Sequence, residues 1–220
     1  MHIMEGFLPP HWAVLWYVLA APVVAYGAYR TWRIVSDRRD AKALLAVVAA
    51  FIFVFSALKI PSIVGSTSHP TGTGLAVVLF GPAVTAFLST IVLLYQALLL
   101  AHGGISTLGA NVFSMGIVGP TAAWLVFLLA RRRTTIARST FLAAVVANLV
   151  TYLVTAGQLA IAFPAGEGLA GVLAAAVNFA AVFAITQVPI AFVEGAIAAG
   201  VIGYLAEVKT DVKSRLEVPA

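Results

Sequence analysis

The sequence predicts an all-α polytopic membrane protein, a bundle of seven transmembrane helices with its N-terminus outside the cell and its C-terminus in the cytoplasm. Composition is the first reason: of the 220 residues, 62% are hydrophobic and only 10% are charged, and the mean hydropathy is +1.04. The second reason is that apolar runs of about twenty residues, long enough to span a bilayer as a helix, recur along almost the whole chain. A membrane β-barrel would instead alternate in segments of about ten residues. We therefore expect residues 1–220 to form a single integral membrane domain.

Apolar stretches and basic clusters together set the expected topology. The stretches lie at about 12–34, 43–58, 73–101, 106–130, 139–163 and 170–205. Basic side chains gather in three places: Arg30, Arg33, Arg38, Arg39 and Lys42; then Arg131, Arg132, Arg133 and Arg138; then Lys209, Lys213 and Arg215. Segments rich in Lys and Arg stay in the cytoplasm. Because the first cluster follows one crossing, the N-terminus is expected outside.

The third apolar stretch, about 73–101, is expected to contain two helices rather than one. With six crossings the second basic cluster would fall outside the cell, so one more crossing is needed before it. The run "TGTGLAVVLFGPAVTAFLSTIVLLYQALLLAHGG" supplies that crossing, because Gly81-Pro82 is a strong helix break. We expect a short helix over about 72–80 and a full one over about 82–101, which makes seven. The expected sides are outside for 1–11 and for the loop 59–72, and cytoplasmic for the tail 205–220.

Several functional classes are excluded by composition. The chain has no cysteine, so disulfides, thiolate metal sites and cysteine nucleophiles are absent, and any metal must be held by nitrogen or oxygen. The net charge of +5 comes from clusters at the ends of apolar runs and does not indicate nucleic-acid binding. The sequence contains no nucleophile–base arrangement, no glycine-rich phosphate loop and no His-Glu-x-x-His motif.

The N-terminus "MHIMEGFLPP" places a histidine directly after the first residue. The α-amine of Met1, the amide nitrogen of His2 and the imidazole Nδ1 of His2 can chelate one ion through five- and six-membered rings. A fourth nitrogen would complete a square, which suits Ni(II) or Cu(II) and can accept Co(II). The competing interpretation is that His2 follows Met1 by chance.

The other histidines supply candidates for the fourth ligand. The loop "KIPSIVGSTSHPTGTG" is expected on the same side as the N-terminus and contains His69, although His69 could also be an ordinary loop residue. His11 adjoins Trp12 at the start of a crossing, which is typical of a membrane-interface belt. His102 ends a helix before two glycines, which predicts a capping role.

Polar residues within the apolar runs are costly in a membrane and can be functional. They are Asn111, Asn148, Asn178, Gln158, Gln187 and Glu194. We expect most of them to form hydrogen bonds between helices.

Small residues at Gly195, Ala199 and Gly203 predict close helix packing within the chain. Two other functions remain open here: a metal-dependent intramembrane hydrolase using His2, His69 and Glu194, and a stand-alone secondary transporter driven by protonation of Glu194.

Five motifs in order resemble the CbiM/NikM family: "MHIMEGFLP", "SALKIPSIVGSTSHPTGTGL", "LFGP", "QALLLAHGG" and "TLGANVFSMGIVGP". These proteins are the membrane substrate-binding subunits of energy-coupling-factor transporters for cobalt and nickel. The resemblance implies six helices shared with vitamin-binding counterparts and one extra N-terminal helix. It also implies a metal held by the Met1 amine, by the backbone and side-chain nitrogens of His2, and by an imidazole at the position of His69. Thr67, in "STSHP", stands where other small residues are also expected.

The resemblance further implies a binding and uptake subunit rather than an enzyme. A transmembrane coupling subunit, cytoplasmic ATPases and a small accessory membrane subunit would be its partners in the cell membrane, with no nucleic acid and no permanently bound cofactor. The start "MHIMEG" resembles the cobalt branch more than the nickel branch, so Co(II) is the expected cargo and Ni(II) the alternative. Cobalt taken up by this family serves cobalamin synthesis.

Overall fold

Helices dominate the part of the chain that the computed structural model describes, residues 1–61 and 66–208. They are α1 (Pro10–Asp37), α2 (Ala41–Ala57), α3 (Thr73–Leu100), α4 (Leu108–Asn111), the π-helix η1 (Val112–Val118), α5 (Gly119–Ala130), α6 (Ile136–Ala162) and α7 (Gly168–Val208). Three short strands are β1 (His2–Ile3), β2 (Ile60–Pro61) and β3 (Ser66–Ser68). The elements α4, η1 and α5 follow one another without a break.

The apolar stretches of the sequence are confirmed as helices. Among the described residues, five helical stretches are long and apolar enough to cross a membrane: α1, α3, residues 108–130, α6 and α7. The helix α2 is shorter but also apolar. The count of seven crossings and the sides of the two termini stay predictions. The helix α7 runs to Val208, and the basic cluster of the expected tail 205–220 lies outside the described residues.

The expected break in the long third run is confirmed at Gly81, whose φ of 77° and ψ of 171° are not helical. Pro82 follows and cannot donate a backbone hydrogen bond to the preceding turn. A straight helix of this length would separate its ends by about 42 Å. The imidazoles of His69, just before α3, and His102, just after it, instead have ring centroids 5.0 Å apart. The chain therefore reverses at Gly81, and both ends of α3 lie at one site.

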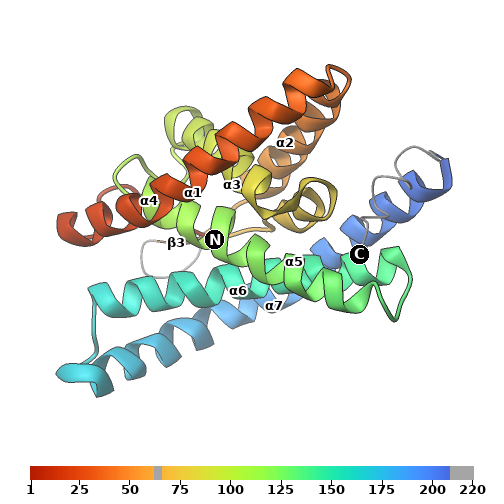
Figure 1. Cartoon of the computed structure of the whole chain (residues 1–220). Coiled ribbons are helices and arrows are strands. Elements are labelled where there is room, and N and C mark those ends of the chain that lie inside the picture. The colour runs from red at the N-terminus through yellow and green to blue at the C-terminus, as the bar shows by residue number, and fades with distance from the viewer. Residues whose placement is uncertain (62–65, 209–220) are drawn as a thin grey trace.

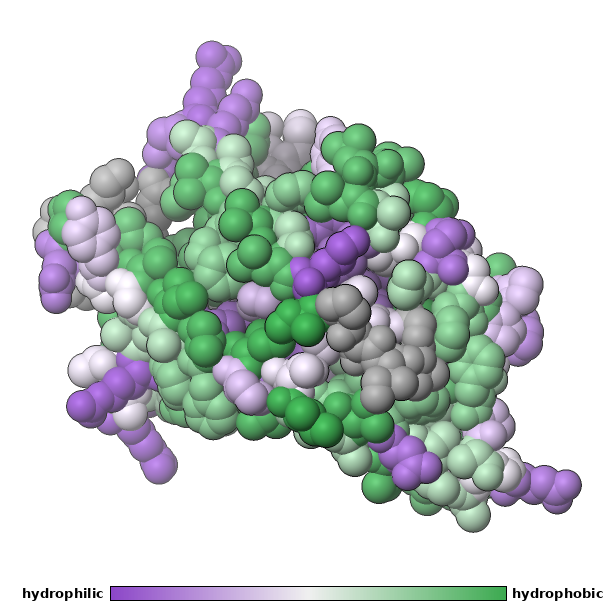
Figure 2. All heavy atoms as spheres, turned by 180° about the vertical axis from the view of Figure 1, so that it is seen from behind, coloured by the Kyte–Doolittle hydropathy of each residue, from purple (hydrophilic) through white to green (hydrophobic). Residues whose placement is uncertain are grey.

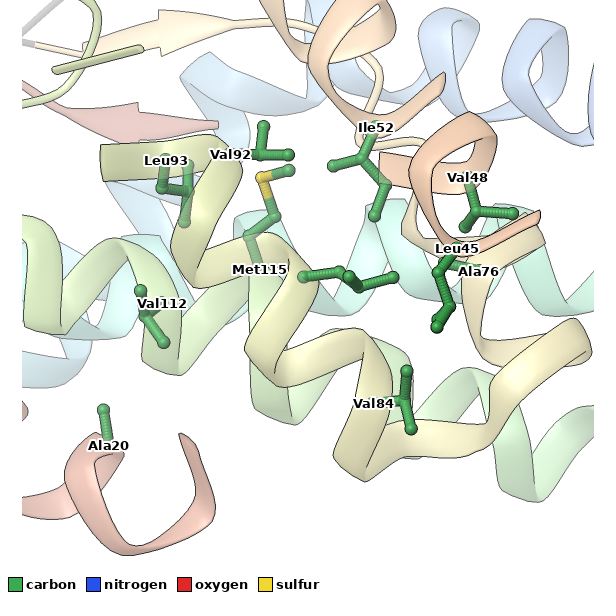
Figure 3. Close-up of a cluster of buried hydrophobic side chains, with 11 residues drawn as sticks. Ala20, Leu45, Val48, Ile52, Ala76, Val84, Val92, Leu93, Val112 and Met115 are labelled. Carbon is green, nitrogen blue, oxygen red and sulfur yellow. The ribbon is translucent and has the colours of Figure 1, made fainter. Parts of the chain in front are cut away.

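The helices enclose an apolar interior that is tightly packed. In Figure 1, α6 and α7 lie side by side, and α1 and α2 lie across the other part of the bundle. Figure 3 shows Ile52, Val92 and Met115 directed toward one another where α2, α3 and η1 meet. Seen from behind in Figure 2, hydrophobic residues form broad areas of the surface, while most hydrophilic ones project at its edges. An apolar outer surface over a packed interior is what a bilayer requires of a helix bundle.

The N-terminus forms a strand, and the segment expected as the loop 59–72 contains two more. The strand β1 pairs antiparallel with β3, with His2 opposite Thr67, and β2 pairs with the other edge of β3. Met1, His2 and Ile3 are buried. Buried backbone groups must find hydrogen-bond partners within the protein, and a small sheet provides them. The N marker in Figure 1 lies near the middle of the bundle.

The packing expected within the chain is confirmed between α6 and α7. A Cβ atom at Gly195 would lie 2.8 Å from the Val145 side chain and 3.0 Å from that of Phe141, so only glycine allows this approach. Side-chain amides also link helices through hydrogen bonds, for example from Gln158 to the Ala110 carbonyl and from Asn148 to Glu194. Asn178 is exposed and makes no such bond within the described part of the chain.

Candidate metal-binding site

Three imidazoles meet beside the N-terminus. His2, His69 and His102 are each at most 1% exposed. One ligand nitrogen from each lies within 4.8 Å of the others, the only such cluster of histidine and acidic side chains found among the described residues. The rings of His2 and His69 have centroids 4.3 Å apart, and those of His2 and His102 4.4 Å. The sequence predicted the first two members of this cluster but not His102.

The α-amine of Met1 is buried with the imidazoles. Met1 is 1% exposed, and burial lowers the pKa of its amine from 8.0 to about 4, with the charge of Glu194 acting in the opposite direction. The amine is therefore uncharged at neutral pH and keeps a free electron pair. An N-terminus is usually solvated and charged, so this burial is a specific property of the site.

The three imidazoles are also uncharged at neutral pH. Burial is the main cause in each, and it holds the pKa values of His2 and His69 well below their usual range. Burial lowers the pKa of His102 to about 3. The neighbouring N-terminal amine adds to the shift in all three. A cluster of neutral nitrogen donors can bind a cation without first releasing protons from them.

His69 has a fixed orientation. Its Nδ1 atom lies 2.7 Å from the carbonyl oxygen of Pro70, which can only accept a hydrogen bond, so Nδ1 must bear the proton. The electron pair of the ring then lies on Nε2, which is buried and has no hydrogen-bond partner. A backbone carbonyl that fixes the tautomer of an imidazole in this way is typical of metal-binding histidines.

His102 contributes both its backbone and its ring, which corrects the expectation of a cap alone. Its amide donates to the Gln96 carbonyl at the end of α3. Its Nε2 atom lies 3.0 Å from Nδ1 of His2 and 2.8 Å from the hydroxyl of Thr67. The motif "AHGG" gave a signal for this role, since histidine beside two glycines permits close approach of another segment.

The two glycines after His102 admit the N-terminal strand. Gly103 has a φ of 74°, and a Cβ atom there would lie 3.1 Å from the side-chain amide of Asn111 and 3.6 Å from Cβ of His2. At Gly104 a Cβ atom would overlap Glu5. Any larger residue at these positions would push the first residues of the chain away from the cluster.

Asn111 holds the backbone of Ile3 as a neighbouring strand would. The Ile3 amide donates to Oδ1 of Asn111 at 2.8 Å, and Nδ2 of Asn111 donates to the Ile3 carbonyl at 3.0 Å. The hydroxyl of Thr107 donates to the same carbonyl at 2.8 Å. These bonds fix the register of the chain next to His2, so Asn111 positions the N-terminus.

Glu194 holds the segment that follows His69. Its Oε2 atom accepts from the Thr71 amide at 2.7 Å and from the Asn148 side-chain amide at 2.8 Å. Its Oε1 atom accepts from the Thr71 hydroxyl and from the Gly72 amide, both at 2.7 Å. The loop at the start of α3 is thus fastened to α7 and α6 in the interior of the bundle.

His11 and Gln187 were also singled out in the sequence. His11 is exposed next to Trp12, with ring centroids 5.4 Å apart, as expected for the end of a crossing. Gln187 is buried in α7, and neither of its side-chain amide atoms has a hydrogen-bond partner among the described residues. His11 is not a member of the histidine cluster found among the described residues.

Comparison with known proteins points to metal uptake. The family model described as "Cobalt uptake substrate-specific transmembrane region" (CbiM) matches residues 2–212. A protein of Halobacterium salinarum is 62% identical over 220 residues, with 100% of both chains covered. One of Archaeoglobus fulgidus is 57% identical over 212 residues, covering 96% of this chain and 97% of the relative. Both are named "Putative cobalt transport protein CbiM".

Solved structures share the fold. A crystal structure of a transition metal transporter matches with a TM-score of 0.83 at 25% identity, covering 99% of this chain and 100% of that one. A truncated transition metal transporter matches with a TM-score of 0.81 at 26% identity, covering 94% of this chain and 99% of that one. The likeness therefore extends over almost the whole helix bundle, including the segments that form the histidine cluster.

Proposed function

Because the chain belongs to the CbiM family of substrate-specific transmembrane proteins for cobalt uptake, we propose that it captures Co(II) with nitrogen atoms of Met1, His2 and His69. It is a multi-pass membrane protein and a transport component rather than an enzyme. The observation that supports the proposed site best is the burial of the uncharged Met1 amine beside the imidazoles. A buried terminal amine without such a role would only destabilise the fold, since its proton must be removed.

Four nitrogens form the proposed ligand set. The Met1 amine, the His2 amide nitrogen and Nδ1 of His2 belong to adjacent residues and chelate the ion in fused rings. The fourth is Nε2 of His69, whose electron pair is free because Nδ1 is bonded to the Pro70 carbonyl. Nδ1 of His2 faces Nε2 of His102, so a bound ion must replace that contact.

The ligand set suggests which ions bind. Four nitrogens in a square suit Ni(II) and Cu(II) and accept Co(II), whereas Zn(II) favours a tetrahedron. Co(II) is the proposed cargo because the similar proteins bear the name of cobalt transport proteins. Ni(II) is the alternative that the donor chemistry also permits.

The proposed uptake needs partners that provide energy. In this proposal the chain is the substrate-binding subunit of an ATP-driven energy-coupling-factor importer. A transmembrane coupling subunit, cytoplasmic ATPases and a small accessory membrane subunit would act with it, and the imported cobalt would enter cobalamin synthesis. The family resemblance supports these partners.

A hydrolase or an independent proton-driven transporter fits the geometry less well. Both would use Glu194 as a group that exchanges protons with water. That carboxylate is 1% exposed, and both of its oxygens accept hydrogen bonds from neighbouring donors. It is therefore held in place and shielded from water.

The test is metal binding by protein with a native N-terminus and a C-terminal tag. We expect the purified protein to bind one equivalent of Co(II) or Ni(II), and equimolar Zn(II) should not displace Co(II). The variant His69→Ala should lose binding because the fourth nitrogen is gone, while inserting into the membrane normally.

His11→Ala is the matched control, because His11 is exposed and lies outside the cluster. It should bind metal as the unaltered protein does. Unchanged binding in the His69→Ala variant would assign the fourth ligand elsewhere, and displacement of Co(II) by Zn(II) would contradict the square arrangement.

A further inference from the structure

Glu194 is a buried acid without a basic partner. It lies in α7 and is 1% exposed. Among the described residues the salt bridge joins Arg38 and Asp40, and Glu194 takes part in no ion pair. Its carboxylate accepts hydrogen bonds from two backbone amides, one side-chain amide and one hydroxyl. Donors at every contact are the surroundings of an ionised carboxylate.

The proposed ligand set leaves a charge that needs compensation. Two imidazoles and an amine are neutral, and the amide nitrogen contributes one negative charge because it releases its proton to solvent water when it binds. A divalent ion held by these groups would therefore retain one positive charge in a buried site, and an isolated buried charge is strongly unfavourable.

Glu194 lies where it can balance that charge. Its carboxylate binds the backbone of Thr71 and Gly72, directly after the segment that contains His69. Among the described residues, Glu194 is the acid whose charge favours the protonated form of the Met1 amine and so raises the pKa of that amine. Glu5, the acid nearest to the cluster in sequence, is exposed and accepts hydrogen bonds from the Ser106 amide instead.

We propose that Glu194 is the counter-charge of the captured ion, an inference that rests on the metal-binding function proposed above. The empty site then has a net charge of minus one, which attracts a divalent cation. The loaded site is neutral, which allows the ion to stay in a dry interior. Glu194 touches neither the ion nor its ligand atoms, so it acts on the site through its charge and through the loop that it holds.

The test compares Glu194→Gln with the unaltered protein, with Cu(II) as the probe ion. Glutamine keeps the size of the side chain and removes its charge. We expect the same visible absorption band for bound Cu(II), since the four nitrogens stay in place, but an affinity weaker by roughly tenfold to a hundredfold. The reduction potential of the bound copper should rise, because the loss of a nearby negative charge disfavours the higher oxidation state.

Two further variants separate charge from loop positioning. Thr71→Val removes one donor to Glu194 and keeps the charge, so the copper potential should stay at its original value. In the double variant Asn148→Asp with Glu194→Gln, the carboxylate moves by one hydrogen-bond length, because Asn148 lies 2.8 Å from Glu194. We expect this double variant to bind Cu(II) more tightly than Glu194→Gln does. Because it still pairs one carboxylate with one amide, it also provides a test if Glu194→Gln alone does not fold.

The outcomes are distinct. Equal affinity and equal potential in Glu194→Gln and the unaltered protein would overturn the inference, and so would an altered absorption band, which would mean that the side chain only positions the loop. Failure of the unaltered protein to bind any metal would instead contradict the proposed function itself.

Discussion

Nε2 of His102 lies 3.0 Å from Nδ1 of His2, although the two residues are a hundred positions apart in the sequence. The same Nε2 atom contacts the hydroxyl of Thr67 in β3, the strand that pairs with β1. The atom that is expected to bind the metal is thus in contact with a third imidazole. His102 is fixed in turn by the hydrogen bond of its own backbone amide to the end of α3.

His102→Ala should weaken metal binding without abolishing it. The side chain holds the ring of His2 but is not among the four proposed ligands, and loss of such an orienting contact costs roughly tenfold to a hundredfold in affinity. Titration with Co(II) should place this variant between His11→Ala and His69→Ala. Complete loss of binding would make His102 a ligand.

Adding residues before Met1 should abolish metal binding. The amine is buried and forms part of the proposed chelate, so an extension moves it away and leaves no room for the added backbone. Metal content of a protein with an N-terminal tag should be near zero, and cleavage of the tag back to Met1 should restore it. Acetylation of the terminus should act like the tag, because it removes the electron pair of the amine. Full binding by the extended chain would refute the role of the first two residues.

Asn111→Leu should reduce metal affinity by roughly tenfold or more, since it removes both hydrogen bonds that hold Ile3 beside the site. Asn111→Asp keeps the acceptor for the Ile3 amide and loses the donor to its carbonyl, so an intermediate loss is expected. Asn178→Leu is the matched control, because Asn178 is exposed. Equilibrium dialysis with Co(II) measures all three. Equal affinities in Asn111→Leu and Asn178→Leu would show that the N-terminus does not depend on this contact.

The empty protein should become more stable as the pH rises from about 4 to 8. The pKa of the Met1 amine is 8.0 when the amine is solvated and about 4 when it is buried. Between these pH values the unfolded chain therefore binds more protons than the folded chain. The free energy of unfolding is therefore lowered at low pH and increases as the pH rises through this range. Thermal unfolding of metal-free protein in detergent should show this trend. A chain extended before Met1, whose amine is not buried, should show a weaker trend, and greater stability at pH 5 than at pH 8 would contradict the buried amine.

Cysteines introduced into this cysteine-free chain can test the predicted sides of the membrane. Ile105, in the loop that follows α3, is 44% exposed, and Thr134, between α5 and α6, is exposed as well. In intact cells an impermeant maleimide should label Ile105→Cys, whereas Thr134→Cys should react only after permeabilisation. Thr71 is buried and unsuitable for labelling. Reaction of both positions from the same side would refute the seven-crossing topology.

The sequence by itself determined the helices and the break within α3. Apolar runs must form helices in a bilayer because their backbone groups have no water to bind, and Gly81-Pro82 interrupts a helix by local chemistry alone. The candidate chelate could also be predicted, because Met1 and His2 are adjacent and need no folding to form fused rings. His69 followed from a topology argument, and the structure brings its ring next to that of His2.

The tertiary structure alone decided which distant groups surround these residues. The reversal of α3 brings His102 to the cluster. Asn111 in α4 and Glu194 in α7 bind backbone segments beside it, across more than a hundred residues of sequence. In the sequence each is a single polar residue in an apolar run, and its periodicity does not reveal which segment it meets. The pairing of β1 with β3 was hidden for the same reason, because two- and three-residue strands form only where a packed interior demands hydrogen-bond partners.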